Sequence, residues 1–219
     1  MLRMRFEKNG NGIWISHLDL MRVFQRAFRR AGLSVRHTQG FNPHAFVSIA
    51  LPLSVGMSSR CEILEFELDG PEVSPDTLPE RLNAVLPAGI RCLEAYPAER
   101  KLKELVWLRT ETVLEYDNGC PDGLIPKLSA LFARETLVVE KKSKSGMVNL
   151  DIRPMLHCLE VRDVDACRVV LDAVVQAQNP PLNPELLVRA IGVYLPTLAP
   201  DFARSARLEI YDADFQIFR

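Results

Sequence analysis

The sequence predicts an α+β fold made of two tandem ferredoxin-like units, each with the element order β-α-β-β-α-β and an antiparallel sheet. Three observations support this prediction. Residues 1–100 alternate between period-two and helical hydrophobic patterns in that order. A polar stretch at residues 97–103 then interrupts the pattern. A similar order begins again and fills residues 104–219, without evident sequence identity between the halves.

The first unit opens with a strand and a helix. Residues 1–8 alternate apolar and charged side chains, which is typical of a half-buried strand. Ser16 is expected to cap a helix, and Asp19 stands three residues later as its capping-box-like partner. The helical period continues to Ala31, and Gly32 is a suitable residue to end it.

The rest of the first unit is predicted to hold three strands and a second helix. Residues 61–68 alternate well between two faces until the turn Asp69-Gly70-Pro71. Pro75 suits the first turn of a helix. The expected strands cover residues 46–53, 61–68 and 90–96, and the expected helix covers residues 74–86.

The second unit, residues 104–219, is predicted to repeat this arrangement around a basic hairpin. Leucines at helical spacing indicate its first helix, and Pro180-Pro181 breaks a later one. The expected strands cover residues 105–116, 137–142, 147–151, 156–161 and 207–211. The expected helices cover residues 121–134, 166–176 and 184–193.

Composition excludes several classes of protein. The 219 residues carry a net charge of −1, so binding to nucleic acid would need a local basic patch. No apolar run approaches the roughly 18 residues that span a membrane, and the N-terminus lacks the pattern of a signal peptide. We therefore expect a cytoplasmic protein without membrane association. Five cysteines without C-x-x-C spacing predict reduced thiols, no metal site and no cofactor.

The first helix is expected to be strongly basic on the face opposite its apolar stripe. Guanidinium groups match phosphate oxygens, so this face could bind RNA or a partner. It could equally be a solvated face whose charges are paired from elsewhere. Asp19 is the only acid in the helix, which favours binding. The arginines concerned are Arg22, Arg26, Arg29 and Arg30, with Arg36 and His37 just after the helix.

His17 is the one candidate catalytic residue. It follows the expected N-cap, where the positive end of the helix disfavours protonation, so a neutral imidazole could serve as a general base. The alternative is a histidine that only bonds backbone groups at the helix entry. His17, Asp19 and His44 could also bind a metal, but three ligands of unknown geometry make a weak signal.

A polar loop follows the helix. Gln39, Asn42 and His44 offer amide and imidazole groups beside the aromatic ring of Phe41. Such groups suit recognition of a planar polar group such as a nucleobase, and they suit a structural turn equally well. With His17 they define an inner pocket, the place where chemistry would be sought.

The second unit contributes two further polar clusters. A basic turn carries Lys141, Lys142 and Lys144, which could contact RNA or a partner, or form a solvated hairpin tip. A polar row follows it: Asn149, Asp151 and Arg153, expected to form either a polar site or an internal Asp–Arg pair. The motifs G-x-S-x-G, G-x-x-x-x-G-K and G-x-G-x-x-G are absent.

Two long segments resemble a known family. SHLDLMRVFQRAFRRAGL with QGFNPHAFVSIALPLSVG is similar to the N-terminal signature of the radical SAM-linked protein family DUF2344, a domain of unknown function associated with radical SAM proteins. KKSKSGMVNLDIRPML resembles its second signature, so the resemblance covers nearly the whole chain. Many relatives have a proline where this sequence has Ala45, and this difference affects the rigidity of the loop more than its chemistry. The matching residues are His17, Asp19, Arg22, Gln39, Gly40, Asn42, Pro43, His44, Asp151 and Arg153.

The resemblance implies a module fused to, or encoded beside, radical SAM proteins. Because the chain lacks a cluster-binding cysteine motif, the expected role is that of a non-catalytic accessory or substrate-presenting partner of a radical SAM enzyme. This partner is expected to bind RNA or another anionic substrate through its basic helix. Whether the chain is an enzyme stays open. The favoured interpretation is that it has no activity of its own. One alternative is a metal-independent RNA-processing endonuclease using His17, by analogy with nucleases that pair two ferredoxin-like units. Another is a purely protein-binding module.

Overall fold

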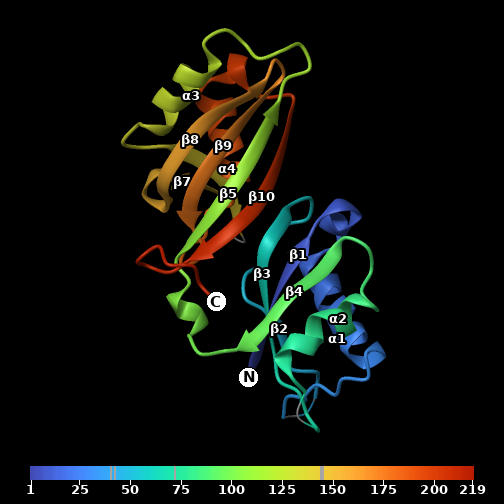
Figure 1. Ribbon diagram of the computed structural model, residues 1–219. Coiled ribbons are helices and arrows are strands. Elements are labelled where there is room, and N and C mark those ends of the chain that lie inside the picture. Colours follow the sequence, from blue (N-terminus) through green and yellow to red (C-terminus); the bar gives the residue numbers. More distant parts are fainter. Residues whose placement is uncertain (40, 42, 72, 144–145) are drawn as a thin grey trace. The chain divides into compact units, whose positions relative to one another are not determined.

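A computed structural model describes residues 1–219 except 40, 42, 72, 144 and 145 (Figure 1). The chain divides into two compact units, one of residues 1–104 with Arg219 and the other of residues 105–218. Both units combine a few helices with antiparallel strands, so the predicted α+β class is confirmed.

The described residues of the first unit form four strands and two helices. Short 3-10 turns, η1 (Gly10–Trp14), η2 (Pro75–Thr77) and η3 (Leu102–Glu104), join or extend them. In chain order the elements are β1 (Leu2–Lys8), α1 (His17–Arg30), β2 (Val47–Ile49), β3 (Ser58–Phe66), α2 (Leu78–Asn83) and β4 (Ile90–Pro97).

The strands of the first unit lie in the order β4-β1-β3-β2, and every neighbouring pair is antiparallel. The register fixes the place of β2, because Phe66 of β3 pairs with Leu2 on one side and with Val47 on the other. Both helices bury apolar side chains in one core with this sheet. Within it the rings of Phe6 and Phe24 meet edge to face at 4.8 Å between centroids.

Local signals account for both ends of α1. The Ser16 side chain accepts a hydrogen bond from the backbone N–H of Asp19 at 3.2 Å, as the N-cap prediction requires. At the other end, Gly32 has φ +66 and its N–H donates to the Arg29 carbonyl, while the Leu33 N–H donates to the Phe28 carbonyl. This pair of bonds is a Schellman motif, so the predicted glycine stop is confirmed.

Two elements of the first unit are shorter than expected. The strand expected at residues 46–53 is reduced to three residues, and Pro52 beyond it has no N–H for a ladder. The helix expected at residues 74–86 is a 3-10 turn followed by six α-helical residues. The helix ends at Asn83. The side chain of this residue donates to the Cys92 carbonyl at 2.9 Å and accepts from the Cys92 N–H at 2.8 Å.

In the described part of the second unit, the strands β10, β5, β9 and β8 lie side by side in that order, each antiparallel to its neighbour, and β6 and β7 form a separate hairpin. Short 3-10 turns η4 (Arg153–Met155) and η5 (Pro196–Leu198) precede β8 and β10. In chain order the elements are β5 (Trp107–Glu115), α3 (Leu124–Phe132), β6 (Val138–Ser143), β7 (Gly146–Asp151), β8 (Leu156–Asp165), β9 (Arg168–Gln176), α4 (Glu185–Tyr194) and β10 (Phe202–Tyr211).

The helix expected at residues 166–176 is wrong, because this segment is the strand β9. It pairs along its length with β5 on one side and β8 on the other. A strand in this central position is buried and rich in β-branched residues, and Val169, Val170 and Val175 are all buried. The valine content was the signal that favoured a strand over a helix.

The helices are short, and the longest, α1, has 14 residues. Within the part of the chain that the structure describes, no helix has the length and apolarity needed to cross a bilayer.

Candidate nucleic-acid interface

The exposed face of α1 carries the predicted arginine stripe, defined here as Arg22, Arg26, Arg29 and Arg30, and all four residues are exposed. Arg22 donates to the Asp19 carboxylate at 2.8 Å and is the member with a local ion pair. Among the described residues, the other three side chains make no hydrogen bond or ion pair. The stripe therefore presents three guanidinium groups to solvent.

The two ends of α1 carry charges that suit the helix dipole. Hydrogen bonds from the Ser16 hydroxyl and then from Arg22 lower the pKa of Asp19 below its usual value, so this carboxylate stays ionised in the first turn. Arg29 and Arg30 occupy the last turn, near the negative end of the helix. The dipole explains cations at these two positions, but it does not explain Arg26 in the middle.

Arg36 does not belong to this unpaired set. Its Nη1 atom lies 2.9 Å from both carboxylate oxygens of Glu67, and its backbone N–H donates to the Glu67 carbonyl. The pair is half-exposed at the surface. Arg36 thus fixes the segment after α1 to the strand region that follows β3.

The segment after α1 turns back on itself. His37 and Ala45 form an antiparallel bridge, and the Thr38 N–H donates to the His44 carbonyl at 2.8 Å. The Thr38 hydroxyl also lies 3.1 Å from Nδ1 of His44. We call residues 35–46 the α1–β2 hairpin. At its tip Gln39 and Phe41 are exposed, whereas the predicted site residue Asn42 lies outside the described residues.

A cavity of about 360 Å³ lies between the C-terminal half of α1 and the α1–β2 hairpin. It brings together two predicted site residues, Arg29 and His44. It also includes Gln25, which the sequence analysis missed, although its spacing of four residues from Arg29 places both on one helix face. The full lining is Gln25, Phe28, Arg29, Leu33, Ser34, Val35, His37, Pro43, His44 and Ala45.

His17 is not part of this cavity. It begins α1, and 12 residues separate it from Arg29, which corresponds to about 18 Å along a helix axis. Among the described residues, the cavity that His44 lines therefore does not include His17, so the expected grouping of His17 with the polar loop stays a prediction. Its Nδ1 atom is buried without a hydrogen-bond partner among the described residues. Across the same residues, no three His, Cys, Asp or Glu side chains are grouped to hold a metal, and His17, Asp19 and His44 do not come together.

The basic turn of the second unit lies on the β6–β7 hairpin. Lys141 is half-buried and Lys142 is exposed on β6, and Lys144 lies outside the described residues. The hairpin is held on α4, where Arg189 donates to the Glu140 carbonyl at 2.7 Å. The two lysines thus stand on a fixed hairpin in a different unit from the arginine stripe.

The predicted polar row has backbone partners. Asp151 accepts hydrogen bonds from the N–H groups of Leu137 and Arg153, at 2.8 and 3.0 Å. The Arg153 guanidinium donates to the Leu156 carbonyl at 2.6 Å. Asn149 is exposed on β7. Asp151 and Arg153 therefore brace the turn between the hairpin and β8.

Comparison with known proteins adds a family and a fold likeness. The family model described as "Uncharacterized protein conserved in bacteria (DUF2344)" matches residues 1–184. No curated protein matches the sequence.

Among solved structures, a chain of a Cbf5-Nop10-Gar1 complex is similar with a TM-score of 0.55 and 8% identity, over 95% of this chain and 48% of that one. The present chain thus spans about half the length of that protein, and at this identity the likeness concerns the fold alone. An unknown protein from Galdieria sulphuraria aligns over 94% of this chain and 96% of its own, at 10% identity, but its TM-score of 0.24 is too low to support an argument.

Proposed function

The chain belongs to the DUF2344 family, and from that premise we propose that it is a non-catalytic accessory protein that binds RNA, or another anionic substrate, and presents it to a radical SAM enzyme. The observation that carries the proposal is the group of unpaired arginines on α1, in a chain whose net charge is −1. Guanidinium groups bind phosphate oxygens in a bidentate manner, and Arg is favoured over Lys where this geometry matters.

The spacing of the stripe argues against a merely solvated face. Arg26 stands four residues after Arg22 and four before Arg30, so these side chains are neighbours on the helix surface. Like charges at this spacing destabilise a helix by a few tenths of a kcal/mol per pair. A polyanion lying along α1 removes this repulsion. A solvated face needs no such concentration of one sign of charge.

The accessory role rests on the family resemblance and on the cysteines. Radical SAM enzymes hold an iron–sulfur cluster through closely spaced cysteines, and cysteine thiolates are the ligands of such clusters. The five cysteines of this chain are dispersed in the sequence, and no two of them form a disulfide in the described part of the chain. We therefore assign the iron–sulfur cluster to the partner enzyme, and substrate binding to this chain.

The ferredoxin-like architecture is proposed for both units. Support for the first unit comes from the order β4-β1-β3-β2, with α1 between β1 and β2 and α2 between β3 and β4. In the second unit, β5, β8, β9 and β10 follow the same scheme in the order β10-β5-β9-β8. There the β6–β7 hairpin is an insertion between α3 and β8.

A salt titration tests the RNA proposal. Binding of a labelled single-stranded RNA to the full chain is measured between about 50 and 200 mM salt, since log affinity falls with log salt by about 0.7 per phosphate contact. The double variant Arg26→Gln/Arg30→Gln should reduce the slope by up to about 1.4. Arg168→Gln is the matched control, because this exposed arginine is paired with Asp165. A slope that the double variant leaves at the wild-type value contradicts the proposal.

Affinity capture from a bacterial lysate tests the partner. The proposal expects a radical SAM protein and RNA to be retained together by the tagged chain. Retention of the protein after nuclease treatment, with no RNA affinity in the titration, would favour the protein-binding module instead.

A second candidate, a metal-independent endonuclease, is favoured by one observation. His17 keeps a buried Nδ1 atom without a partner among the described residues, and a buried polar atom left without a partner can mark a catalytic residue. Labelled RNA is incubated with the protein in the presence of a chelator. Cleavage by the wild type that His17→Ala abolishes, with unchanged RNA affinity, would replace the non-catalytic proposal.

A further inference from the structure

The cavity between α1 and the α1–β2 hairpin has an apolar floor and a polar, cationic rim. Phe28, Leu33 and Val35 form the floor and are 1%, 5% and 6% exposed. Polar side chains around it come from α1 and from the hairpin, and no carboxylate of the described residues lines it. We propose that this cavity binds a single nucleotide of the RNA, with the phosphate on Arg29 and His37 and the ring over the floor. The inference rests on the proposed function of the arginine stripe.

The size of the cavity suits one nucleotide. Its volume of about 360 Å³ lies at the small end of the range for ligand pockets, roughly 300 to 1,000 Å³. An apolar surface with a few convergent polar groups is the usual composition of such pockets. A nucleotide matches it, because it joins a flat ring to a charged phosphate.

Arg29 is the anchor for the phosphate. Its guanidinium is exposed and makes no ion pair or hydrogen bond within the described part of the chain. His37 reaches the same cavity from the hairpin, and its ring likewise makes no hydrogen bond or ion pair with the described residues. Gln25, one helical turn before Arg29, contributes an amide whose donors and acceptor can pair with a base edge.

The cavity is formed before any ligand binds. The Leu33 N–H donates to the Phe28 carbonyl at 2.9 Å, and Val35 forms an antiparallel bridge with Leu68. Thr38 and His44 are hydrogen-bonded across the hairpin next to its tip. Binding to a preformed pocket avoids the cost of ordering loops. A strand that lies along the arginine stripe reaches this pocket at Arg29.

Titration calorimetry on the full chain tests the inference with four probes: a nucleoside 5′-monophosphate, the matching nucleoside, inorganic phosphate and a single-stranded RNA. The monophosphate should bind, and the nucleoside and inorganic phosphate should each bind about 10-fold more weakly or worse, since each lacks one of the two contacts. Arg29→Gln and His37→Gln should each weaken monophosphate binding by about 10-fold. Arg168→Gln is the control, because this exposed arginine belongs to the other unit and is paired with Asp165, and it should leave monophosphate binding unchanged.

A second variant keeps the test independent of charge. Ala45→Leu places a larger side chain at the cavity wall and should abolish monophosphate binding, while the salt slope for RNA falls by no more than the one phosphate contact made in the cavity, about 0.7. Thermal unfolding confirms that the variant is folded.

The outcomes separate the two proposals. Failure of the monophosphate to bind, or equal binding by Arg29→Gln and wild type, overturns the nucleotide pocket while the RNA slope still supports the stripe. Inorganic phosphate that binds as tightly as the monophosphate overturns the ring contact. Monophosphate binding that depends on Arg29, without any binding of RNA, supports the pocket and overturns the proposed function.

Discussion

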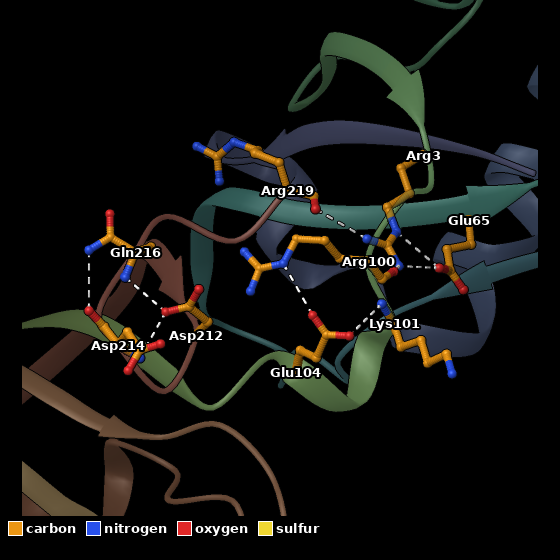
Figure 2. Close-up of polar contacts among 9 residues, drawn as sticks. All are labelled: Arg3, Glu65, Arg100, Lys101, Glu104, Asp212, Asp214, Gln216 and Arg219. Carbon is orange, nitrogen blue, oxygen red and sulfur yellow. Dashed lines mark hydrogen bonds and ion pairs between the residues drawn. The ribbon is translucent and has the colours of Figure 1, made fainter.

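The guanidinium of Arg3 donates two hydrogen bonds to one carboxylate oxygen of Glu65, from Nε at 3.0 Å and from Nη2 at 2.8 Å (Figure 2). The two residues are paired across β1 and β3. Their side chains are 1% and 13% exposed. Arg3 also donates to the carbonyls of Arg100 and Arg219, at 2.5 and 3.2 Å. A buried cation thus has its donors distributed over a carboxylate and two backbone groups.

Removing the carboxylate should therefore be costly. Glu65→Leu leaves the Arg3 charge buried without its counter-ion, and we expect it to lower the free energy of unfolding by about 3 to 5 kcal/mol. Arg3→Met together with Glu65→Leu should recover most of this loss, because an apolar pair can replace a buried ion pair. Urea denaturation at pH 7 measures both. If the free energy of unfolding of Glu65→Leu lies within about 1 kcal/mol of the wild-type value, the pair is solvated in solution.

Gly12 and Gly89 make a close backbone contact that leaves no room for a side chain. A Cβ atom on Gly12 would lie 2.5 Å from the Gly89 carbonyl oxygen. Gly12→Ala should destabilise the first unit by about 2 kcal/mol or more, as overpacking does. Gly192→Ala is the matched control, since this exposed glycine of α4 has nothing within 4 Å of an added Cβ. Alanine there should raise stability by about 0.5 to 1 kcal/mol. Urea denaturation that ranks the two variants in the opposite order would contradict the contact.

Asp172 gives the second unit a defined dependence on pH. Hydrogen bonds from Arg109, at 3.0 and 2.7 Å, lower the pKa of Asp172, and the charge of Arg162 lowers it further. A depressed pKa in the folded state contributes stability above the unfolded pKa of about 3.9, and this is lost as pH falls through the folded value.

Asp172→Asn should thus cost about 1 kcal/mol at pH 7, a low figure for charge-assisted bonds because both arginines are partly exposed. The difference from wild type in urea denaturation should shrink as pH falls below about 4. The control is Glu135→Gln, an exposed side chain with no hydrogen bond or ion pair among the described residues. A cost for Asp172→Asn that is constant between pH 7 and pH 3 would argue against an ionised Asp172.

Interactions between near neighbours in the sequence could be predicted, and those between distant segments could not. The caps of α1 depend on Ser16, Asp19 and Gly32, all within or next to the helix, and the prediction identified them. The segment 166–176 was assigned to the wrong class because its state is set by pairing with two strands distant in sequence. Periodicity alone does not separate a buried strand from a helix.

The candidate site also has a part that the sequence predicts and a part that depends on distant contacts. The arginine stripe follows from helical periodicity, so its four members were identified correctly as one exposed face. The cavity beside it was not predicted, because it requires the bridge between His37 and Ala45 to carry the hairpin back against Arg29. His17 was expected to share an inner pocket with the polar loop, whereas the described cavity at this loop is lined by Arg29, twelve residues further along α1, and not by His17.

Tyr96 and Tyr116 differ in one hydrogen bond, which predicts opposite effects of the same substitution. The Tyr96 hydroxyl is buried and has no partner among the described residues. The Tyr116 hydroxyl donates to the Leu198 carbonyl at 3.0 Å. Tyr96→Phe should leave stability unchanged or raise it, since it removes an unsatisfied polar group, whereas Tyr116→Phe should cost about 1 kcal/mol in urea denaturation at pH 7.

The alkaline limb gives an independent check on Tyr96. Burial raises the pKa of Tyr96 to about 12, so its contribution is complete below the unfolded pKa of about 10 and is lost as pH rises towards the folded value. The stability of wild type should therefore fall between about pH 10 and 12 more steeply than that of Tyr96→Phe. Parallel falls would mean that the Tyr96 hydroxyl is reached by water, and a loss of stability in Tyr96→Phe at pH 7 would mean that it has a hydrogen-bond partner in solution.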